Sequence, residues 1–265
     1  MDLLPYKLTL TPLGVAAATV IGRRFGPSLG GWVAGIPFTS APIAIFVTIE
    51  HGVLFGTITA ASILAATASQ AVFALFYSVV AVRFRWPLAL AAAIAGFAGA
   101  TAGLLQLQPP PVAALEIAIG SIALALSLMP RARTSDPATA ALTAPPLPPP
   151  VDVALRAVVA TVIVVVITAL SLRLGPTLAG LLSPLPVFGA VLIVFPHAQL
   201  GTAAAISACR GFLWGLFSAT AFAFTLAQLL PNSGLAAAMA AALVAALVVQ
   251  GATLLVLRRG RATRR

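Results

Sequence analysis

Long apolar stretches, separated by short charged, proline or glycine positions, run through almost the whole sequence. A membrane-spanning helix needs about 20 consecutive apolar residues, and nine stretches come close to that length or exceed it. The third and the eighth are about 30 residues long, which allows strong tilt or an extension into the membrane interface. The predicted spans are 6–22, 28–49, 53–82, 86–107, 112–129, 151–172, 177–195, 201–230 and 235–257. The pattern therefore predicts an all-helical integral membrane protein.

The composition excludes a water-soluble domain. Hydrophobic residues make up 61% of the 265 residues and charged residues only 8%, whereas soluble domains average about 45–50% and about 25%. The mean hydropathy is +1.10, so the chain has more apolar surface than a single core can bury. Most of that surface must face lipid, which makes the lipid bilayer the main partner that we expect.

The basic residues predict the orientation of the chain. A net charge of +10 in a soluble protein would favour a nucleic-acid partner, but here the basic residues occupy gaps between apolar stretches, where they hold loops in the cytoplasm. With nine crossings and a cytoplasmic tail at 258–265, 12 of the 15 basic residues lie inside. We therefore expect the N-terminus outside, the C-terminus in the cytoplasm and no nucleic-acid partner. If 28–49 and 177–195 were re-entrant loops, seven crossings would remain and Arg131 and Arg133 would lie outside.

Residues 130–150 differ from the apolar stretches on either side. They contain RARTSDP and APPLPPP, whose polar residues cannot enter lipid and whose prolines favour extended polyproline structure. We expect a cytoplasmic linker here between two membrane units. The first unit is residues 1–129, with about five spans, and the second is residues 151–265, with about four spans and the basic tail.

The second unit repeats part of the first. At a separation of 149 positions, LGPTLAGLLSPLPVFGAVLIVF (174–195) aligns with FGPSLGGWVAGIPFTSAPIAIF (25–46), and downstream, at a separation of 145, GT at 56–57 meets GT at 201–202. Chance alignment of segments rich in Ala, Leu and Gly is the alternative. Because five spans precede the second copy, it would enter the membrane from the opposite side. Inverted repeats interrupted by Gly and Pro are typical of secondary transporters with a site near the bilayer midplane.

Each copy is interrupted in the middle of a predicted span. Gly35, Pro37 and Pro42 interrupt the first copy, and Pro184 and Pro186 interrupt the second. Each proline lacks a backbone donor and disfavours helix in the residue before it. Because unpaired backbone groups cost several kcal/mol in hydrocarbon, such a break persists only inside protein or beside a wet cavity. We interpret the breaks as parts of a transport site, and a kinked structural helix is the alternative.

Polar side chains near the breaks are candidates for substrate binding. Thr39, Ser40 and Ser183 are central in their spans, and Arg210 lies ten residues into the eighth span, about 15 Å deep at about 1.5 Å per residue. A buried arginine stays protonated and needs an anion or a ring of carbonyls. Together with the positive ends of the half-helices, Arg210 predicts a site for a small anionic or zwitterionic solute. A structural ion pair between Arg210 and Glu116 is the alternative.

The ends of the broken spans carry further titratable or polar side chains. Glu50 and His51 end the second span, and His197 and Gln199 end the seventh. With Glu116 they are candidate gate or coupling groups, because histidine titrates near neutral pH and burial can tune a glutamate. Interfacial caps without a transport role are the alternative.

Three pairs of glycines lie four residues apart, which places each pair on one face of a helix. The pairs are Gly52 and Gly56, Gly99 and Gly103, and Gly211 and Gly215. Small residues at this spacing predict close packing between membrane helices.

Catalysis is not expected from this sequence. Two His, one Cys and five acidic residues leave no nucleophile, base and orienting group at a known spacing, and no phosphate-binding loop is present. We expect no metal and no cofactor. Secondary transport by alternating access is the predicted function, and a non-transporting membrane assembly or lipid-interaction protein is the alternative.

One part of the sequence resembles a known family. The segments AGLLSPLPVF (179–188) and RGFLWG (210–215), and more weakly AGIPFTSAP (34–42) and EHG (50–52), resemble the GlpM-like family of small bacterial inner-membrane proteins. The similarity covers about 50 residues of each half. Members are about half as long, so this chain would be a fused, tandem version. The resemblance implies a bacterial inner-membrane location and paired assembly in the single-unit relatives, which adds a homodimer to the expectations. It supplies no substrate, and Gln199 departs from the charged loop that the family suggests there.

Overall fold

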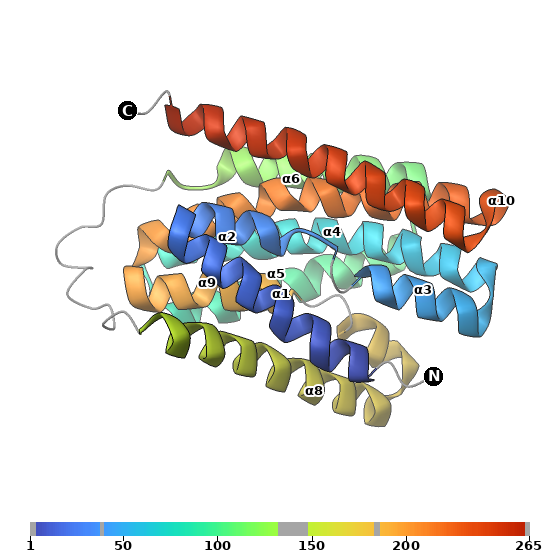
Figure 1. Cartoon of the computed structure of the whole chain (residues 1–265), viewed down its shortest axis with the longest axis horizontal. Coiled ribbons are helices and arrows are strands. Elements are labelled where there is room, and N and C mark those ends of the chain that lie inside the picture. The colour runs from blue at the N-terminus through green and yellow to red at the C-terminus, as the bar shows by residue number, and fades with distance from the viewer. Residues whose placement is uncertain (1–3, 38–39, 132–147, 183–185, 263–265) are drawn as a thin grey trace.

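The computed structural model describes residues 4–37, 40–131, 148–182 and 186–262, and within these ranges the chain is helical throughout apart from short connections. This confirms the predicted all-helical class (Figure 1). The helices are α1 (Leu4–Phe25), α2 (Pro27–Ala34), α3 (Ser40–His51), α4 (Val53–Ala81), α5 (Trp86–Leu107), α6 (Pro111–Leu128), α8 (Pro149–Leu182), α9 (Val187–Leu200) and α10 (Thr202–Ala262).

Four helices in the described ranges are long and apolar enough to cross a membrane. They are α4, α5, α6 and α10, and α9 is a shorter apolar helix of 14 residues. Within α10, Gly234 has φ 71° and ψ 165°, outside the helical region, so that two helical segments meet there at a kink. The chain therefore has the helix lengths and the composition of a membrane protein.

The helices lie side by side along the long axis of the molecule (Figure 1). α10 contacts α4 and α2 over their lengths, α4 also contacts α5 and α6, and α1 contacts α8 and α2. Large buried side chains fill the space around α4 and the first segment of α10, including Phe73, Tyr77, Leu213 and Phe222. We call the end at which α4 finishes and α8 begins the inner end.

Glycines allow α2 and α10 to pack with their backbones in contact. Gly31 and Gly35 on α2 face α10, and Gly211 and Gly215 on α10 face α2. A Cβ atom on Gly211 would overlap the carbonyl oxygen of Ser28. The close packing predicted for Gly211 and Gly215 is thereby confirmed, and the contact fixes α2 against the centre of the bundle.

The same prediction is wrong for Gly99 and Gly103, and of the remaining pair it holds for Gly56, which packs against Thr48 and Leu230, but not for Gly52. A Cβ atom on Gly99 or Gly103 would meet no other atom within 4 Å. Gly52 lies outside a helix: it has φ 88° and separates α3 from α4. Spacing alone shows that small residues share a helix face, but which neighbour covers that face depends on the tertiary packing.

The break expected in the first copy is present. α2 ends at Ala34 and α3 begins at Ser40; between them Gly35 and Pro37 are buried and Ile36 is half-buried. Because α2 ends inside the protein, its last carbonyl groups need partners. Gln250 Nε2 donates to the carbonyl oxygen of Trp32 at 3.0 Å. At this break the end of α2 is therefore buried in protein, and the carbonyl group of Trp32 has a hydrogen-bond partner on α10.

In the second copy the helix also ends at the predicted interruption, but the predicted boundary between the sixth and seventh spans is wrong. Its helix does not end at 172 but continues to Leu182, through the Gly175–Pro176 pair, and α9 begins after Pro186, which is buried. A proline inside a helix removes one hydrogen bond and can be accommodated as a kink. Thr39, Ser183, Pro184 and most of the linker, 132–147, lie outside the described residues.

Candidate functional site

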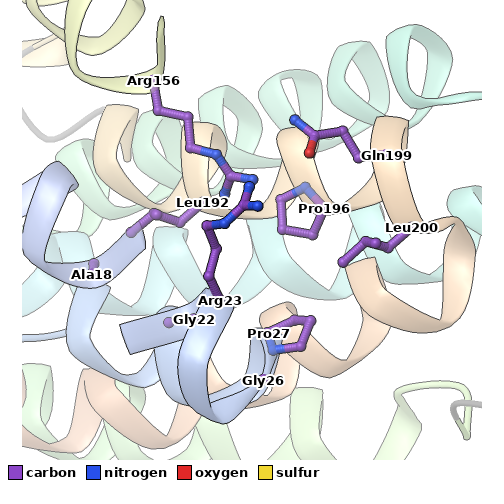
Figure 2. A pocket seen from close by; sticks show the side chains of 11 residues that line it. Ala18, Gly22, Arg23, Gly26, Pro27, Arg156, Leu192, Pro196, Gln199 and Leu200 are labelled. Atoms are coloured by element: carbon purple, nitrogen blue, oxygen red, sulfur yellow. The ribbon is translucent and has the colours of Figure 1, made fainter. Parts of the chain in front are cut away.

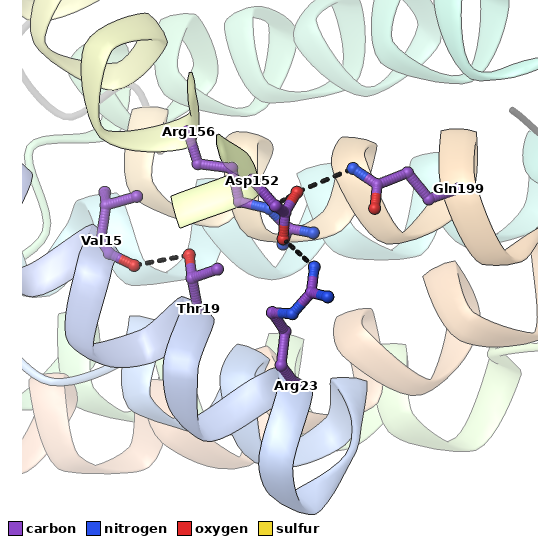
Figure 3. Close-up of polar contacts among 6 residues, drawn as sticks. All are labelled: Val15, Thr19, Arg23, Asp152, Arg156 and Gln199. Atoms are coloured by element: carbon purple, nitrogen blue, oxygen red, sulfur yellow. Dashed lines mark hydrogen bonds and ion pairs between the residues drawn. The ribbon is translucent and has the colours of Figure 1, made fainter. Parts of the chain in front are cut away.

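One carboxylate joins three helices at the inner end of the bundle. Asp152 Oδ1 accepts hydrogen bonds from Arg156 Nε at 2.9 Å and from Gln199 Nε2 at 2.8 Å, and Oδ2 accepts one from Arg23 Nη1 at 2.8 Å (Figure 3). The Asp152 side chain has no exposed surface. We call these four residues the Asp152 cluster. It connects α1 to α8 and α9.

Local sequence places the two charges of α8 next to each other. Asp152 lies in the first turn of α8, where the partial positive charge of the helix N-terminus stabilises a carboxylate. Arg156 follows four residues later, the spacing at which side chains on one helix face meet. Its guanidinium carbon lies 5.0 Å from the centre of the Phe195 ring, a cation–π contact. The Arg156 guanidinium is therefore held by Asp152 and by α9.

A cavity of about 220 Å³ lies beside the Asp152 cluster, between α1, α2, α8 and α9 (Figure 2). We call it the Arg156 cavity. Its polar lining comes from Arg23, Arg156 and Gln199, and its apolar lining includes Ala18, Leu192, Pro196 and Leu200. The two guanidinium groups extend toward each other from opposite sides (Figure 2).

The electrostatic character of this cavity is positive. The charged side chains that line the cavity are Arg23 and Arg156. Gly26 and Pro27, at the N-terminal end of α2, also line the cavity, and no side chain caps that helix end. Uncapped N–H groups of a helix start add to the positive potential. The arrangement therefore favours an anion.

Arg156 has donors available for such an anion. The residue is only 5% exposed, and its Nε atom is taken by Asp152. Within the described part of the chain its two terminal nitrogens, which carry four N–H donors, have no hydrogen-bond partner. A carboxylate or phosphate oxygen in the cavity would satisfy them with charge-assisted hydrogen bonds.

Of the residues predicted to bind substrate, the two that the structure describes, Ser40 and Arg210, do not line this cavity. Ser40 is half-buried at the start of α3. Arg210 Nη2 donates to the carbonyl oxygen of Pro130 at 3.4 Å, just beyond the end of α6. Gly215, which faces the break at Gly35, is five residues further along α10, about 7 Å away at about 1.5 Å per residue. Arg210 is therefore nearer to the inner end than the break is.

The alternative role for Arg210 is wrong. Glu116 is exposed near the start of α6, whereas Arg210 lies beside Pro130, 14 positions later. At about 1.5 Å per residue this separation is about 21 Å, too far for an ion pair.

The gate candidates fall into two groups. Glu50 and His51 are exposed at the end of α3, and the His51 ring lies 5.0 Å from that of Phe55. His197 is buried on α9, and its Nδ1 lies 3.0 Å from the hydroxyl of Tyr77 on α4. Of these predicted residues, Gln199 contributes to the Asp152 cluster.

Three residues of the site were missed by reasoning from the sequence. Asp152 is one of only five acidic residues in the chain and precedes Arg156 by four positions at the start of an apolar stretch. A charge at such a place is expected to be paired, and this signal could have indicated the pair on α8. No local signal connects Arg23 to them, because it lies 129 positions away from Asp152.

Comparison with protein-family models, with curated proteins and with solved structures finds no match. The similarity to the GlpM-like family therefore stays a prediction.

Proposed function

We propose that this protein is a secondary transporter of the bacterial inner membrane that moves a small anionic or zwitterionic solute by alternating access. The observation that carries the proposal is the Arg156 cavity, which is bounded by α1 and α2 from the first unit and by α8 and α9 from the second. A solute site between two units that rock against each other can be exposed to each side in turn. Its two arginines supply the charge that an anion requires.

The order of the helices supports two related units. Gly52 has φ 88° and ψ 172° and separates α3 from α4, and Gly201, 149 positions later, has φ 84° and ψ −176° and separates α9 from α10. Arg85 and Gly234, also 149 positions apart, each precede a long helical segment. The separation of 149 positions, at which 25–46 aligns with 174–195, therefore also relates these downstream positions. The helix boundaries do not require the shorter separation of 145 positions that the sequence alignment used there.

The directions of the helices support an inverted arrangement. α3 ends where α4 begins, at Gly52. α9 ends beside the last turn of α4, because Thr202 Oγ1, just after α9, donates to the carbonyl oxygen of Ala81 at 3.1 Å. The two short helices therefore point to opposite ends of α4. Nine crossings in two inverted units, with the N-terminus outside and the C-terminus in the cytoplasm, account for this geometry and for the charge distribution.

Matched cysteine variants test the inverted arrangement. We expect Arg83→Cys to react with a membrane-impermeant maleimide only from the cytoplasmic side and Asn232→Cys, 149 positions later, only from outside. Both positions are exposed, and Cys209 is buried, so Cys209→Ser provides a background without other thiols. Reaction of both variants from the same side would disprove the inverted units.

Transport by reconstituted protein tests the function itself. In proteoliposomes we expect protein-dependent uptake of at least one of three radiolabelled probes, lactate, succinate and glutamate. Arg156→Gln should lower that uptake at least tenfold because it removes the charged donors of the cavity. Arg83→Gln removes an exposed arginine and should leave uptake unchanged. Absence of protein-dependent uptake for all three probes would favour the alternative, a membrane assembly or lipid-interaction protein.

A further inference from the structure

We propose that the solute of the Arg156 cavity is a hydroxycarboxylate: its carboxylate binds Arg156, its hydroxyl group donates to Gln199, and an apolar body occupies the rest of the cavity. This inference rests on the proposed transport function and specifies its substrate class. It makes Gln199 the residue that distinguishes a hydroxy acid from the same acid without the hydroxyl group.

The amide of Gln199 has a fixed orientation. Asp152 is paired with two arginines, and an ionised carboxylate only accepts hydrogen bonds. The group that Gln199 presents to Asp152, at 2.8 Å, is therefore its donor Nε2. The amide oxygen Oε1 is turned away from Asp152 as a consequence (Figure 3).

This amide oxygen is an acceptor that the surrounding protein does not use. Gln199 lines the cavity and is 8% exposed. Within the described ranges its Oε1 accepts no hydrogen bond, since the contact of Gln199 with Asp152 uses the nitrogen. A polar atom in such a buried position is costly without a partner. The partner of Oε1 must therefore be a donor on a molecule inside the cavity.

The acceptor lies close to the unused donors of Arg156. Arg156 Nε and Gln199 Nε2 both bond the same oxygen, Asp152 Oδ1, at 2.9 and 2.8 Å. The two side chains are therefore close neighbours at the edge of one cavity (Figure 2). In the part of the chain that the structure describes, the terminal nitrogens of Arg156 have no hydrogen-bond partner. Donors and an acceptor so close together match a carboxylate and a hydroxyl group on neighbouring carbon atoms.

The geometry of Arg156 favours a carboxylate as the anionic group. Its guanidinium is fixed by Asp152 through Nε and by the ring of Phe195 at 5.0 Å. With Nε occupied, the two terminal nitrogens form the available edge. The parallel N–H donors of a guanidinium match the two coplanar oxygens of a carboxylate.

The volume of the cavity determines the size of the rest of the solute. About 220 Å³ corresponds to about seven water molecules at about 30 Å³ each. The carboxylate and the hydroxyl group occupy only the polar part of this space. The apolar walls include Ala18, Leu192, Pro196 and Leu200. A body of several carbon atoms would fill the space between them and remove apolar surface from water, so we expect a solute larger than the smallest hydroxy acids.

A hydroxyl group suits this acceptor better than an ammonium group. The charged side chains that line the cavity are Arg23 and Arg156, and the side chain of Asp152 has no exposed surface. An ammonium group would lie beside arginines with a neutral amide oxygen as its partner, and burying a charge without a counter-ion is costly. A hydroxyl group makes the same hydrogen bond without that cost.

Three ligands that share one carbon skeleton test the hydroxyl group. 3-Phenyllactate, 3-phenylpropionate and phenylalanine carry a hydroxyl group, a hydrogen atom or an ammonium group at the same carbon. With the full-length protein in phosphatidylcholine nanodiscs at pH 7, we expect saturable binding of 3-phenyllactate by calorimetry. The other two ligands should bind about fivefold or more weakly, because each lacks the neutral donor. Empty nanodiscs give the background.

A variant of Gln199 tests whether this residue recognises the hydroxyl group. Gln199→Met keeps the length of the side chain and removes its amide. We expect the affinities for 3-phenyllactate and 3-phenylpropionate to become equal to within about twofold, because the acceptor is gone. A merely structural effect would weaken both ligands together and leave their ratio unchanged. Gln106→Met, the matched change at an exposed glutamine of α5, should alter neither affinity.

A variant of Arg156 tests the other half of the site. Arg156→Gln should weaken 3-phenyllactate and 3-phenylpropionate by the same factor, about tenfold or more, because both present the same carboxylate. Unchanged affinities in this variant would overturn the site. The comparison of the three ligands on the parent protein requires no variant, so the proposal stays testable even if a substitution prevents folding.

The outcomes separate this inference from the proposed function. Equal affinities for 3-phenyllactate and 3-phenylpropionate in the parent would overturn the hydroxy acid, and so would tighter binding of phenylalanine. A ratio that persists in Gln199→Met would overturn the role of Gln199. No saturable binding of 3-phenyllactate would overturn the whole inference. In each case protein-dependent uptake in proteoliposomes would leave the transport function standing, and only the additional absence of uptake would contradict both.

Discussion

Replacing Gly211 by alanine is expected to lower the free energy of unfolding by about 3 kcal/mol. The added Cβ atom would overlap the carbonyl oxygen of Ser28, a backbone atom that cannot rotate away. α2 and α10 would have to separate along their whole contact, including the one between Gly35 and Gly215. Unfolding of the detergent-solubilised protein in a denaturing-detergent titration measures the effect.

Gly251→Ala is the matched control for this change. Gly251 lies in the second segment of α10, and a Cβ atom there would meet nothing within 4 Å. Because alanine is favoured over glycine inside a helix by about 0.8–1.0 kcal/mol, we expect unchanged or slightly raised stability. Equal stabilities for Gly211→Ala and Gly251→Ala would show that the backbone contact between α2 and α10 is not formed.

Replacing Asp152 by alanine is expected to destabilise the protein by about 3–5 kcal/mol, the usual cost of removing one partner from a buried ion pair. Arg156, whose side chain is 6% exposed, would lose its counter-ion and stay charged. The loss would also disconnect α1 from α8 and α9, since each contributes one hydrogen bond to this carboxylate. The decrease in melting temperature of the variant, measured in the same detergent, reports this loss of stability.

A double variant distinguishes lost charge balance from lost packing. Combining Asp152→Ala with Arg156→Met removes the unpaired cation and keeps most of the apolar volume of the side chain. We expect the double variant to be more stable than Asp152→Ala alone, because the buried charge is the main source of the cost. The opposite order would show that Arg156 stabilises the fold independently of Asp152.

Isolated apolar helices could be predicted closely from the sequence. The predicted span 86–107 has the bounds of α5, and 53–82 differs from α4 by one residue. In hydrocarbon a helix satisfies its own backbone groups, so an apolar stretch between charged or proline residues has one favourable conformation. The predicted end at 172 is wrong by ten residues, because whether a Gly–Pro pair ends a helix or bends it depends on the surrounding packing.

The candidate site was less accessible to sequence reasoning. Gln199 was among the predicted residues, but its partner Asp152 is 47 positions away and Arg23 is further still. Such contacts follow from how α1, α8 and α9 pack, and helical periodicity does not contain that information. Counting residues from the start of the eighth span also placed Arg210 wrongly at the level of the break at Gly35. The count fails because neighbouring helices determine how far a helix is shifted along its axis.

The contacts of α2 connect the two halves of the chain. By sequence this helix belongs to the predicted first unit, yet Gly31 and Gly35 contact α10, and its last turn is held by Gln250 and by a hydrogen bond from Trp32 to Thr253. α1 contacts α2 through Gly22 and Gly30, and it is also attached to α8 through Asp152. These contacts therefore join material from both halves of the chain, α2 to α10 and α1 to α8.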